Sequence, residues 1–326
     1  MNSTTTATHE HSKVTKAVKS WLGFRPVDLD SDQKDEDKVD WVRAVPFILL
    51  HLACIAVLWV GISWIAVAVA VALYLVRMFV ITTFYHRYFS HRAFKTSRFV
   101  QAMAAFIGAT AAQRGALWWA AHHRHHHLES DTEHDLHSPR HRGMIMAHCG
   151  WFLTDRAFNA PSKLTRDWNR FPELVWMDRF CLVPPILLLV MMFGLGYVLN
   201  AYFPGLGTSG WQMVIWGFCI STVVTYHATY AINSLAHRFG SARFKTDDDS
   251  RNNFWLALLT LGEGWHNNHH HYPASARQGF FWWEIDISYY MILGMRTLKL
   301  VHDVRMLPPR VIDAARNQAL NEGSSS

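Results

Sequence analysis

Apolar residues gather in four long runs, which form two pairs separated by polar, histidine-rich segments. Each run is close to the length of about 20 residues that a helix needs to cross a bilayer. The members of each pair are joined by short turns, at 61–63 and 200–210, the second of which contains glycine and proline. The pattern therefore predicts two hairpins of transmembrane helices, with spans at 45–61, 62–84, 181–199 and 211–232.

The remaining segments predict one membrane domain with polar ends. Residues 1–40 are polar and contain no apolar stretch typical of a signal peptide, so we expect them to be flexible and cytosolic. The domain itself is predicted to cover 41–305, followed by a C-terminal tail at 306–326. Within the domain, Phe99–Ala112 is apolar but rich in alanine, which predicts an interfacial or re-entrant helix.

The distribution of basic residues predicts the orientation of the spans. Neither turn within a hairpin contains lysine or arginine, whereas the N-terminal segment, 85–180 and the chain after 233 hold nearly all of them. Basic segments stay on the cytosolic side of a membrane. Both termini and every dense histidine cluster are therefore expected on that one side.

Composition supports a membrane protein and argues against other classes. Half of the residues are hydrophobic and 17% are charged, against about a quarter in soluble domains. The net charge of +6 does not indicate nucleic-acid binding, because no dense Lys/Arg block is present. The four cysteines form no CxxC pair, so we expect buried free thiols rather than disulfides or a thiolate metal site.

Histidines form spaced groups that suit metal binding. Side chains three or four residues apart share one face of a helix, and imidazole binds zinc, copper, iron and nickel. Nine imidazoles exceed the four ligands of a tetrahedral zinc site, so the pattern favours two metal ions. The candidate ligands are His86 and His91 in HRYFSH, His123, His126 and His127 in HRHHH, Asn233 and His237 in NSLAH, and His266, His269 and His270 in HNNHH.

A solvated patch and a metal transporter are the two alternative interpretations of the histidines. One HxxHH cluster alone is often a solvated patch, but three clusters on one side of a membrane are hard to obtain by chance. A metal transporter would place its ligands within the spans, where this chain has only His51 and His227. The roles of some neighbours stay open, namely His122, His125, His134, His137, His227 and His271.

The order HxxxxH, HxxHH, NxxxH, HxxHH resembles that of the integral-membrane fatty acyl desaturases, the family of stearoyl-CoA desaturase, in its bacterial form. The flanking runs SDTEHDLHSP, HCGWFL and GEGWHNNHHHYP are similar too, and the resemblance extends over about 70–290. It implies an all-α membrane fold with a cytosolic helical cap in a bacterial inner membrane. The implied reaction uses O₂ to insert a cis double bond into a saturated acyl chain, at the ninth carbon. Related di-iron lipid hydroxylases, with different spacings, are the alternative.

The resemblance also implies roles for individual residues. The nine histidines would bind two iron ions, with Asn233 joining through a water, and no catalytic residue is expected beyond these ligands. In the family a Gln, a Trp and a Thr shape the bend of the acyl tunnel, and they match Gln113, Trp119 and Thr229. Tyr74 and Met78 would lie at the far end, where a bulky Met suggests a shorter acyl chain.

Two departures from the family concern the carrier of the acyl chain. The animal acyl-CoA enzymes have Arg-Asp before the second box, where this chain has Ala121-His122, and a basic pair where it has Asp155-Arg156. Acyl-CoA is the expected substrate, with phospholipid-bound or carrier-protein-bound chains as alternatives. Because no HPGG-type haem segment is present, we expect an external electron donor: a ferredoxin, rubredoxin or cytochrome with its NAD(P)H reductase.

Overall fold

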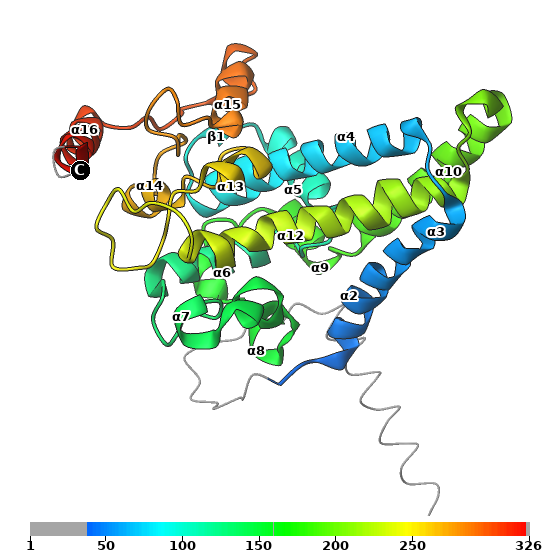
Figure 1. Ribbon diagram of the computed structural model, residues 1–326, viewed down its shortest axis with the longest axis horizontal. Helices are drawn as coiled ribbons and strands as arrows, with labels where there is room; N and C mark the ends of the chain where they lie inside the picture. The colour runs from blue at the N-terminus through cyan, green and yellow to red at the C-terminus, as the bar shows by residue number, and fades with distance from the viewer. Residues whose placement is uncertain (1–37, 159, 324–326) are drawn as a thin grey trace, which may run out of the picture.

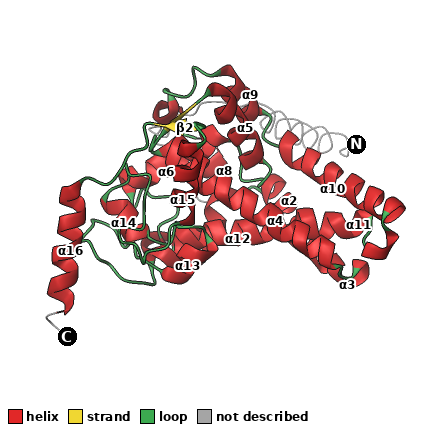
Figure 2. Cartoon of the chain, turned by 90° about the horizontal axis from the view of Figure 1, so that it is seen from above, coloured by secondary structure: helices red, strands yellow, loops and turns green. Residues whose placement is uncertain are grey.

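Two long helical hairpins and a cap of short helices make up the described part of the chain, residues 38–158 and 160–323 of a computed structural model (Figures 1 and 2). The predicted N-terminal segment at 1–40 lies almost wholly outside this range. The hairpins run side by side and their turns lie at one end of the molecule, while the cap lies at the other (Figure 1).

The first hairpin begins with a helix that has a side-chain N-cap and ends with a π-helical segment. The Asp40 carboxylate accepts a hydrogen bond from the Val42 amide, and the Ser63 hydroxyl accepts one from the Ala66 amide, the usual arrangement at a helix start. Gly61 separates the two arms with a φ of +68°, which favours glycine. The elements are α2 (Trp41–Ala53), η1 (Cys54–Ala56), α3 (Val57–Val60), α4 (Trp64–Val80) and the π-helical η2 (Ile81–Ser90).

The second hairpin has a long outer arm and an inner arm that is helical throughout. Its turn contains the short helix η6 (Pro204–Leu206), and Ser209 caps the returning arm through the Gln212 amide. The other elements are α10 (Val183–Tyr202), α11 (Gly210–Met213), the π-helical η7 (Val214–Ile220), α12 (Ser221–Ser234) and η8 (Leu235–His237).

Three of the described helices are long and apolar enough to cross a membrane: Trp41–Val60, Trp64–Ser90 and Val183–Tyr202. They correspond to three of the predicted spans, and the second ends six residues later than predicted because η2 continues it. The inner arm Gly210–Ser234 is not among them, since Ser221, Thr222 and Thr225 make it more polar. The fourth span therefore stays a prediction.

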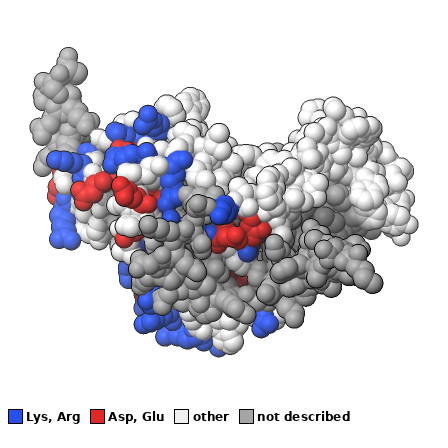
Figure 3. All heavy atoms as spheres, turned by 90° about the horizontal axis from the view of Figure 1, so that it is seen from below, with Lys and Arg blue, Asp and Glu red and all other residues white. Residues whose placement is uncertain are grey.

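The cap holds the polar part of the chain. On the face drawn in Figure 3, charged side chains gather toward the cap, and the end with the hairpin turns displays none. The only sheet of the described residues is a two-residue antiparallel pair that joins β1 to β2. The cap elements are β1 (Lys95–Thr96), α5 (Arg98–Ala109), α6 (Ala116–Glu129), α7 (Pro139–Arg142), η3 (Met146–Gly150), η4 (Trp151–Leu153), α8 (Asp155–Phe158), η5 (Ser162–Thr165), α9 (Pro172–Arg179), α13 (Phe254–Leu259), α14 (His266–His271), α15 (Ile287–Thr297), β2 (Val301–His302) and α16 (Pro309–Gly323).

Two expectations about the cap can be compared with the structure. The segment predicted as an interfacial helix, 99–112, forms α5, which is a helix as expected. The predicted tail contains α16, whose Val311 and Ala315 are buried in an apolar cluster with Phe244 and Phe280. The first half of the tail therefore packs onto the cap.

Packing fixes the elements that carry the histidines. The largest apolar cluster joins η2 to α5 and α6, with Tyr85 and Phe89 fully buried in it. A second cluster, around Met213 and Phe218, holds the two hairpins together. At about 25 cal/mol per Å² of buried apolar surface, the first cluster is a large stabilising contribution in the cap, and it leaves η2 and α6 little freedom to move.

Candidate metal centre

The nine predicted histidines converge on two neighbouring points. At each point, one ring nitrogen from every histidine lies within 4.8 Å of those from the other histidines of its group. Group A comes from η2, its C-cap, α6 and α14, and group B comes from α6, η8 and α14. Group A contains His86, His91, His123, His127 and His269, and group B contains His126, His237, His266 and His270.

Helix α6 supplies both groups because of its spacing. His123 and His127 are four residues apart and face group A, while His126 is rotated away from them toward group B. Helix α14 repeats the arrangement, with His269 in group A and its neighbour His270 in group B. Neighbouring side chains on one helix therefore point into two different groups. Such an arrangement suits a centre with two metal ions.

Distances between ring nitrogens fit metal ligation. The Nε2 atoms of His91 and His123 are 2.8 Å apart, and those of His237 and His266 are 3.0 Å apart. Two nitrogens bound at right angles and at about 2.1 Å from one ion lie about 3 Å apart. The buried Nε2 of His270 has no hydrogen-bond partner among the described residues. The donor set therefore fits two ions that prefer imidazole ligands.

Carboxylates hold the outer nitrogens of group B. Nδ1 of His126 donates to Asp135 over 3.0 Å, and Nδ1 of His237 donates to Asp131 over 2.8 Å. Asp248 accepts from Nδ1 of the third ring, His270, over 2.5 Å. A proton fixed on Nδ1 leaves the Nε2 lone pair directed at the metal position. Each of these rings is thus oriented by a partner outside the metal-binding set.

Group A has one such carboxylate, within a buried ion network. Glu263 accepts from Nδ1 of His86 through one oxygen and pairs with Arg87 through the other, over 3.0 Å. Arg87 also pairs with Asp286 over 2.9 Å, and all of these side chains are buried. Because a buried charge is costly without partners, the network binds η2, α15 and the loop before α14 into one unit.

The electrostatics favour neutral rings and ionised carboxylates. Burial, followed by the neighbouring imidazoles, holds the pKa of His123, His127 and His269 well below the ordinary 6.5. Burial alone would raise the pKa of Asp131, but its hydrogen bond with His237 lowers that pKa below its usual range. At pH 7 these three rings are therefore in the neutral form that binds a metal, and the Asp131 carboxylate stays a hydrogen-bond acceptor.

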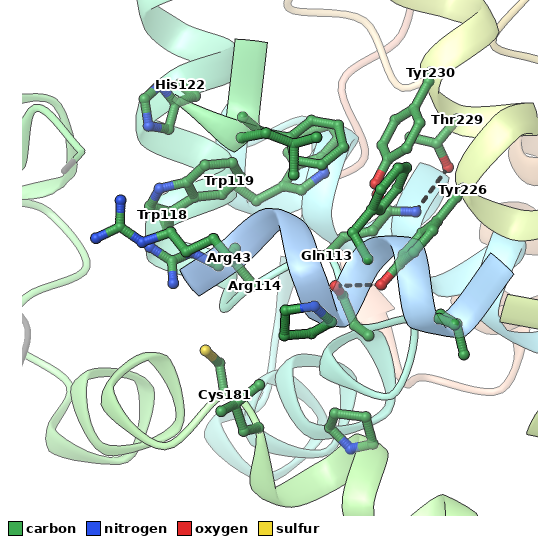
Figure 4. A pocket seen from close by; sticks show the side chains of 18 of the residues that line it. Arg43, Gln113, Arg114, Trp118, Trp119, His122, Cys181, Tyr226, Thr229 and Tyr230 are labelled. Atoms are coloured by element: carbon green, nitrogen blue, oxygen red, sulfur yellow. Dashed lines mark hydrogen bonds between the residues drawn. The ribbon is translucent and has the colours of Figure 1, made fainter. Parts of the chain in front are cut away.

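A cavity of about 330 Å³ leads from the surface toward the histidines (Figure 4). Its inner end is lined by Gln113, Trp119, Thr229, Asn233 and His123. Nε2 of Gln113 donates to the Thr229 hydroxyl over 3.1 Å, drawn as a dashed line in Figure 4. The three residues predicted to shape the tunnel bend thus lie together at its inner end.

A second, smaller cavity of about 40 Å³ continues past this point. It shares Trp119, Thr229, Asn233 and His123 with the large cavity, and Met78 lines it further on. Members of both histidine groups line it as well, including His86 and His266. The two cavities therefore meet beside the candidate metal centre.

Tyr74 and Asn233, two further predicted site residues, differ in their position relative to the cavities. Tyr74 lines neither cavity; its hydroxyl donates to the Leu259 carbonyl, and its ring packs near Met78. Asn233 lines both cavities, and the smaller one also contains His126 and His266 of group B.

The neighbouring histidines lie outside the two groups. His122 lines the large cavity, and His271 stacks on Phe244 with ring centroids 3.8 Å apart. His137 lies beside His126 and Asp135. His227 bridges His51 and His148 through hydrogen bonds of 3.1 and 2.9 Å, and His134 is exposed.

Sequence reasoning missed the four carboxylates that orient the rings. Asp131 and Asp135 lie just beyond the second box and Glu263 just before the last, so proximity was an available signal. Asp248 lies in the run DDD, 22 residues before His270, and reaches it only because the loop folds back. No spacing rule would have identified it.

The sequence is similar to proteins of one known family. Residues 62–290 match the fatty acid desaturase family. Among similar proteins are the sn-1 stearoyl-lipid 9-desaturase of Synechocystis sp., 37% identical over 65% of this chain and 62% of that protein, and the sn-2 palmitoyl-lipid 9-desaturase of Nostoc sp., 32% identical over 65% of this chain and 72% of that protein. An acyl-CoA 5-desaturase of Anemone leveillei is 34% identical over 65% of this chain and 64% of that protein.

Proposed function

Because the chain belongs to the fatty acid desaturase family, we propose that it removes two hydrogens from adjacent methylene groups of a saturated fatty acyl chain. The product is a cis double bond. One O₂ takes up the two hydrogens together with two electrons and two protons, and two waters leave. The electrons come from an external donor, a ferredoxin, rubredoxin or cytochrome with its NAD(P)H reductase.

The observation that carries this proposal is the position of the two histidine groups at the junction of the two cavities. An acyl methylene has no acidic hydrogen, so acid–base chemistry by side chains cannot remove one. Groups A and B would hold two iron ions, with Asn233 joining group B through a water. Bound iron supplies the activation of O₂ that the reaction requires.

The protein's own residues would select which carbons react. An acyl chain is uniform along its length, so depth in a closed tunnel is the only measure of position. Trp119, with the hydrogen-bonded pair Gln113 and Thr229, forms the wall where the cavities meet. We propose that this wall bends the chain so that its ninth and tenth carbons face groups A and B. Met78 then limits the length of chain beyond them.

The test is product analysis in a bacterial host that lacks its own desaturase. The chain would be expressed with a donor system and air, and double bonds would be located by mass spectrometry of derivatised fatty acids. We expect a cis-9 monoene that disappears in His123→Ala. The matched control is His134→Ala, which changes an exposed histidine outside both groups. Hydroxylated chains in place of the monoene would instead support the hydroxylase alternative.

A further inference from the structure

Helix α13 is apolar on every side, although it belongs to the cap. Its sequence, FWLALL, consists of apolar residues only. Leu256 and Ala257 face inward and are buried, whereas outward Phe254 is 41% exposed, Trp255 76% and Leu259 43%. A helix that is apolar all round is normally enclosed by protein or by lipid. The outward side of α13 therefore lacks, within the described chain, the cover that such a helix requires.

The exposed apolar surface continues from α13 to the end of the second hairpin. Phe239, which is 56% exposed, follows η8. Its carbonyl accepts a hydrogen bond over 3.3 Å from the side chain of Asn253, the residue directly before α13. We call Phe239, Phe254, Trp255 and Leu259 the α13 patch. A group of large exposed apolar side chains marks a surface that is covered in the protein's working environment.

The α13 patch adjoins the exposed apolar side of α4. The Tyr74 hydroxyl donates to the Leu259 carbonyl, which joins the end of α13 to α4. Tyr74 lies within the candidate span Trp64–Ser90, and next to it Val71 and Leu75 are 51% and 45% exposed. Figures 1 and 2 both draw α13 beside the cap end of α12, which it contacts. The patch therefore continues a surface that faces lipid if α4 crosses the membrane.

The charges in the sequence around the patch suit the head groups of a bilayer. Arg238, which is exposed, directly precedes Phe239, and Arg251 precedes α13. Neither 235–246 nor 251–262 contains an aspartate or glutamate. Tryptophan is enriched at membrane–water interfaces, and nearby basic residues attract anionic lipids. Composition and continuity with α4 thus both favour the bilayer as the cover of the patch.

We propose that α13 is an interfacial helix, and that the α13 patch lies in the boundary between head groups and acyl chains of the leaflet on the cap side. Lipid then covers the outward side of α13 as protein covers its inward side, and the apolar area buried in the boundary stabilises the contact. The inference goes beyond the proposed desaturation and does not depend on it. It binds the cap to the bilayer through an element other than the two hairpins.

This contact joins the bilayer to the last histidine box. The segment from Thr260 to Trp265 is buried throughout and leads from α13 directly to His266, the first residue of α14. Thr260 and Glu263 of this segment line the small cavity. The depth of α13 in the interface therefore fixes the height of these residues relative to the hairpins.

The experiment measures the depth of position 255 with a nitroxide spin label. The full-length protein, with its four cysteines replaced by alanine, is placed in nanodiscs that contain phosphatidylglycerol. The label is attached in three single variants: Trp255→Cys, Leu58→Cys in the candidate span Trp41–Val60, and Asp247→Cys at an exposed position of the cap. Power saturation of the EPR signal then gives the collision rates of the label with O₂, which dissolves in lipid, and with a nickel chelate, which stays in water.

A lipid cover and its alternatives give different collision rates. We expect the ratio of O₂ to nickel collisions at position 255 to be severalfold higher than at 247 and lower than at 58. Equal ratios at 255 and 247 would overturn the proposal, because the patch would then face water. Low access of both reagents to position 255 would overturn it as well, because the patch would then be covered by protein, such as a second copy of the chain.

A charge on the patch provides a second test, in which the native cysteines stay in place. Trp255→Glu puts a carboxylate on the outward side of α13, whereas the matched variant Trp255→Leu keeps an apolar side chain there, and both new residues are good helix formers. A charge that must leave water is costly, so we expect the glutamate variant to unfold in nanodiscs at a clearly lower temperature than the leucine variant. In contact with water the same charge would cost little, and equal unfolding temperatures would overturn the proposal.

Discussion

At the scale of single residues, four of the nine histidines are held by a carboxylate at Nδ1, the nitrogen that faces away from the candidate metal position. His126, His237 and His270 each donate from Nδ1 to an aspartate, while His86 donates to Glu263. The histidines themselves could be predicted from their spacing, because three- and four-residue intervals share a helix face. Their division into groups A and B, and the aspartate from a distant loop, depend on how α6 and α14 pack, which no local pattern encodes.

The first prediction concerns the aspartate that orients His237. Asp131 accepts from His237 and from the Ser138 hydroxyl, so Asp131→Asn would leave one donor facing another and loosen the ring. Loss of such a partner weakens metal binding about 10- to 100-fold. Iron retained per chain after dialysis against a chelator would be measured by mass spectrometry. Asp303→Asn, which breaks only an exposed pair with Lys95, is the control, and equal iron retention in the two variants would refute the role of Asp131.

At the scale of elements, helix α6 carries three of the nine histidines and is held at its start by another helix. Asp178 of α9 accepts hydrogen bonds from the Leu117 and Trp118 amides, over 2.9 and 3.0 Å. Gly115 precedes the helix because a Cβ there would lie 2.1 Å from the Asp178 carboxylate. The sequence predicted the helical face of HRHHH, but not this cap, since the usual signal is a polar residue immediately before the helix.

The second prediction follows from the burial of this cap. Burial raises the pKa of Asp178 from 3.8 to about 6, although the two amide hydrogen bonds oppose the shift. The folded protein therefore holds this proton more tightly than the unfolded chain does. Its contribution to the free energy of unfolding is full below pH 3.8 and is lost as the pH rises through about 6. Thermal unfolding in detergent from pH 4.5 to 7 should show the wild type losing stability relative to Asp178→Asn. Parallel curves for the two proteins would contradict the assignment.

At the scale of the whole molecule, the two hairpins place the cap on one side. The turns of the hairpins lack basic residues, and the cap holds most of them. Three spans could be predicted from apolar runs and meet the same criteria in the structure. The fourth predicted span is less apolar because its helix α12 lines the cavity with polar side chains, among them Thr229 and Asn233. These residues lower the hydropathy by which a span is predicted.

The third prediction tests this topology by labelling single cysteines with a membrane-impermeant maleimide. Gly205→Cys lies in the turn of the second hairpin, where an added side chain meets nothing within 4 Å. Asp303→Cys lies on the cap. With four spans and a cytosolic cap, the first should react in cells with a permeabilised outer membrane, and the second only after the inner membrane is opened. The wild-type chain gives the background from its own four cysteines, and labelling of both positions from the same side would exclude the arrangement.

The most direct test of the central claim is the metal content of the same purified sample in which desaturation is assayed. Groups A and B predict two iron ions per chain in active protein, with iron and activity lost together in His266→Ala and retained in His134→Ala. Desaturation by protein with one ion per chain, or with zinc in place of iron, would contradict the account.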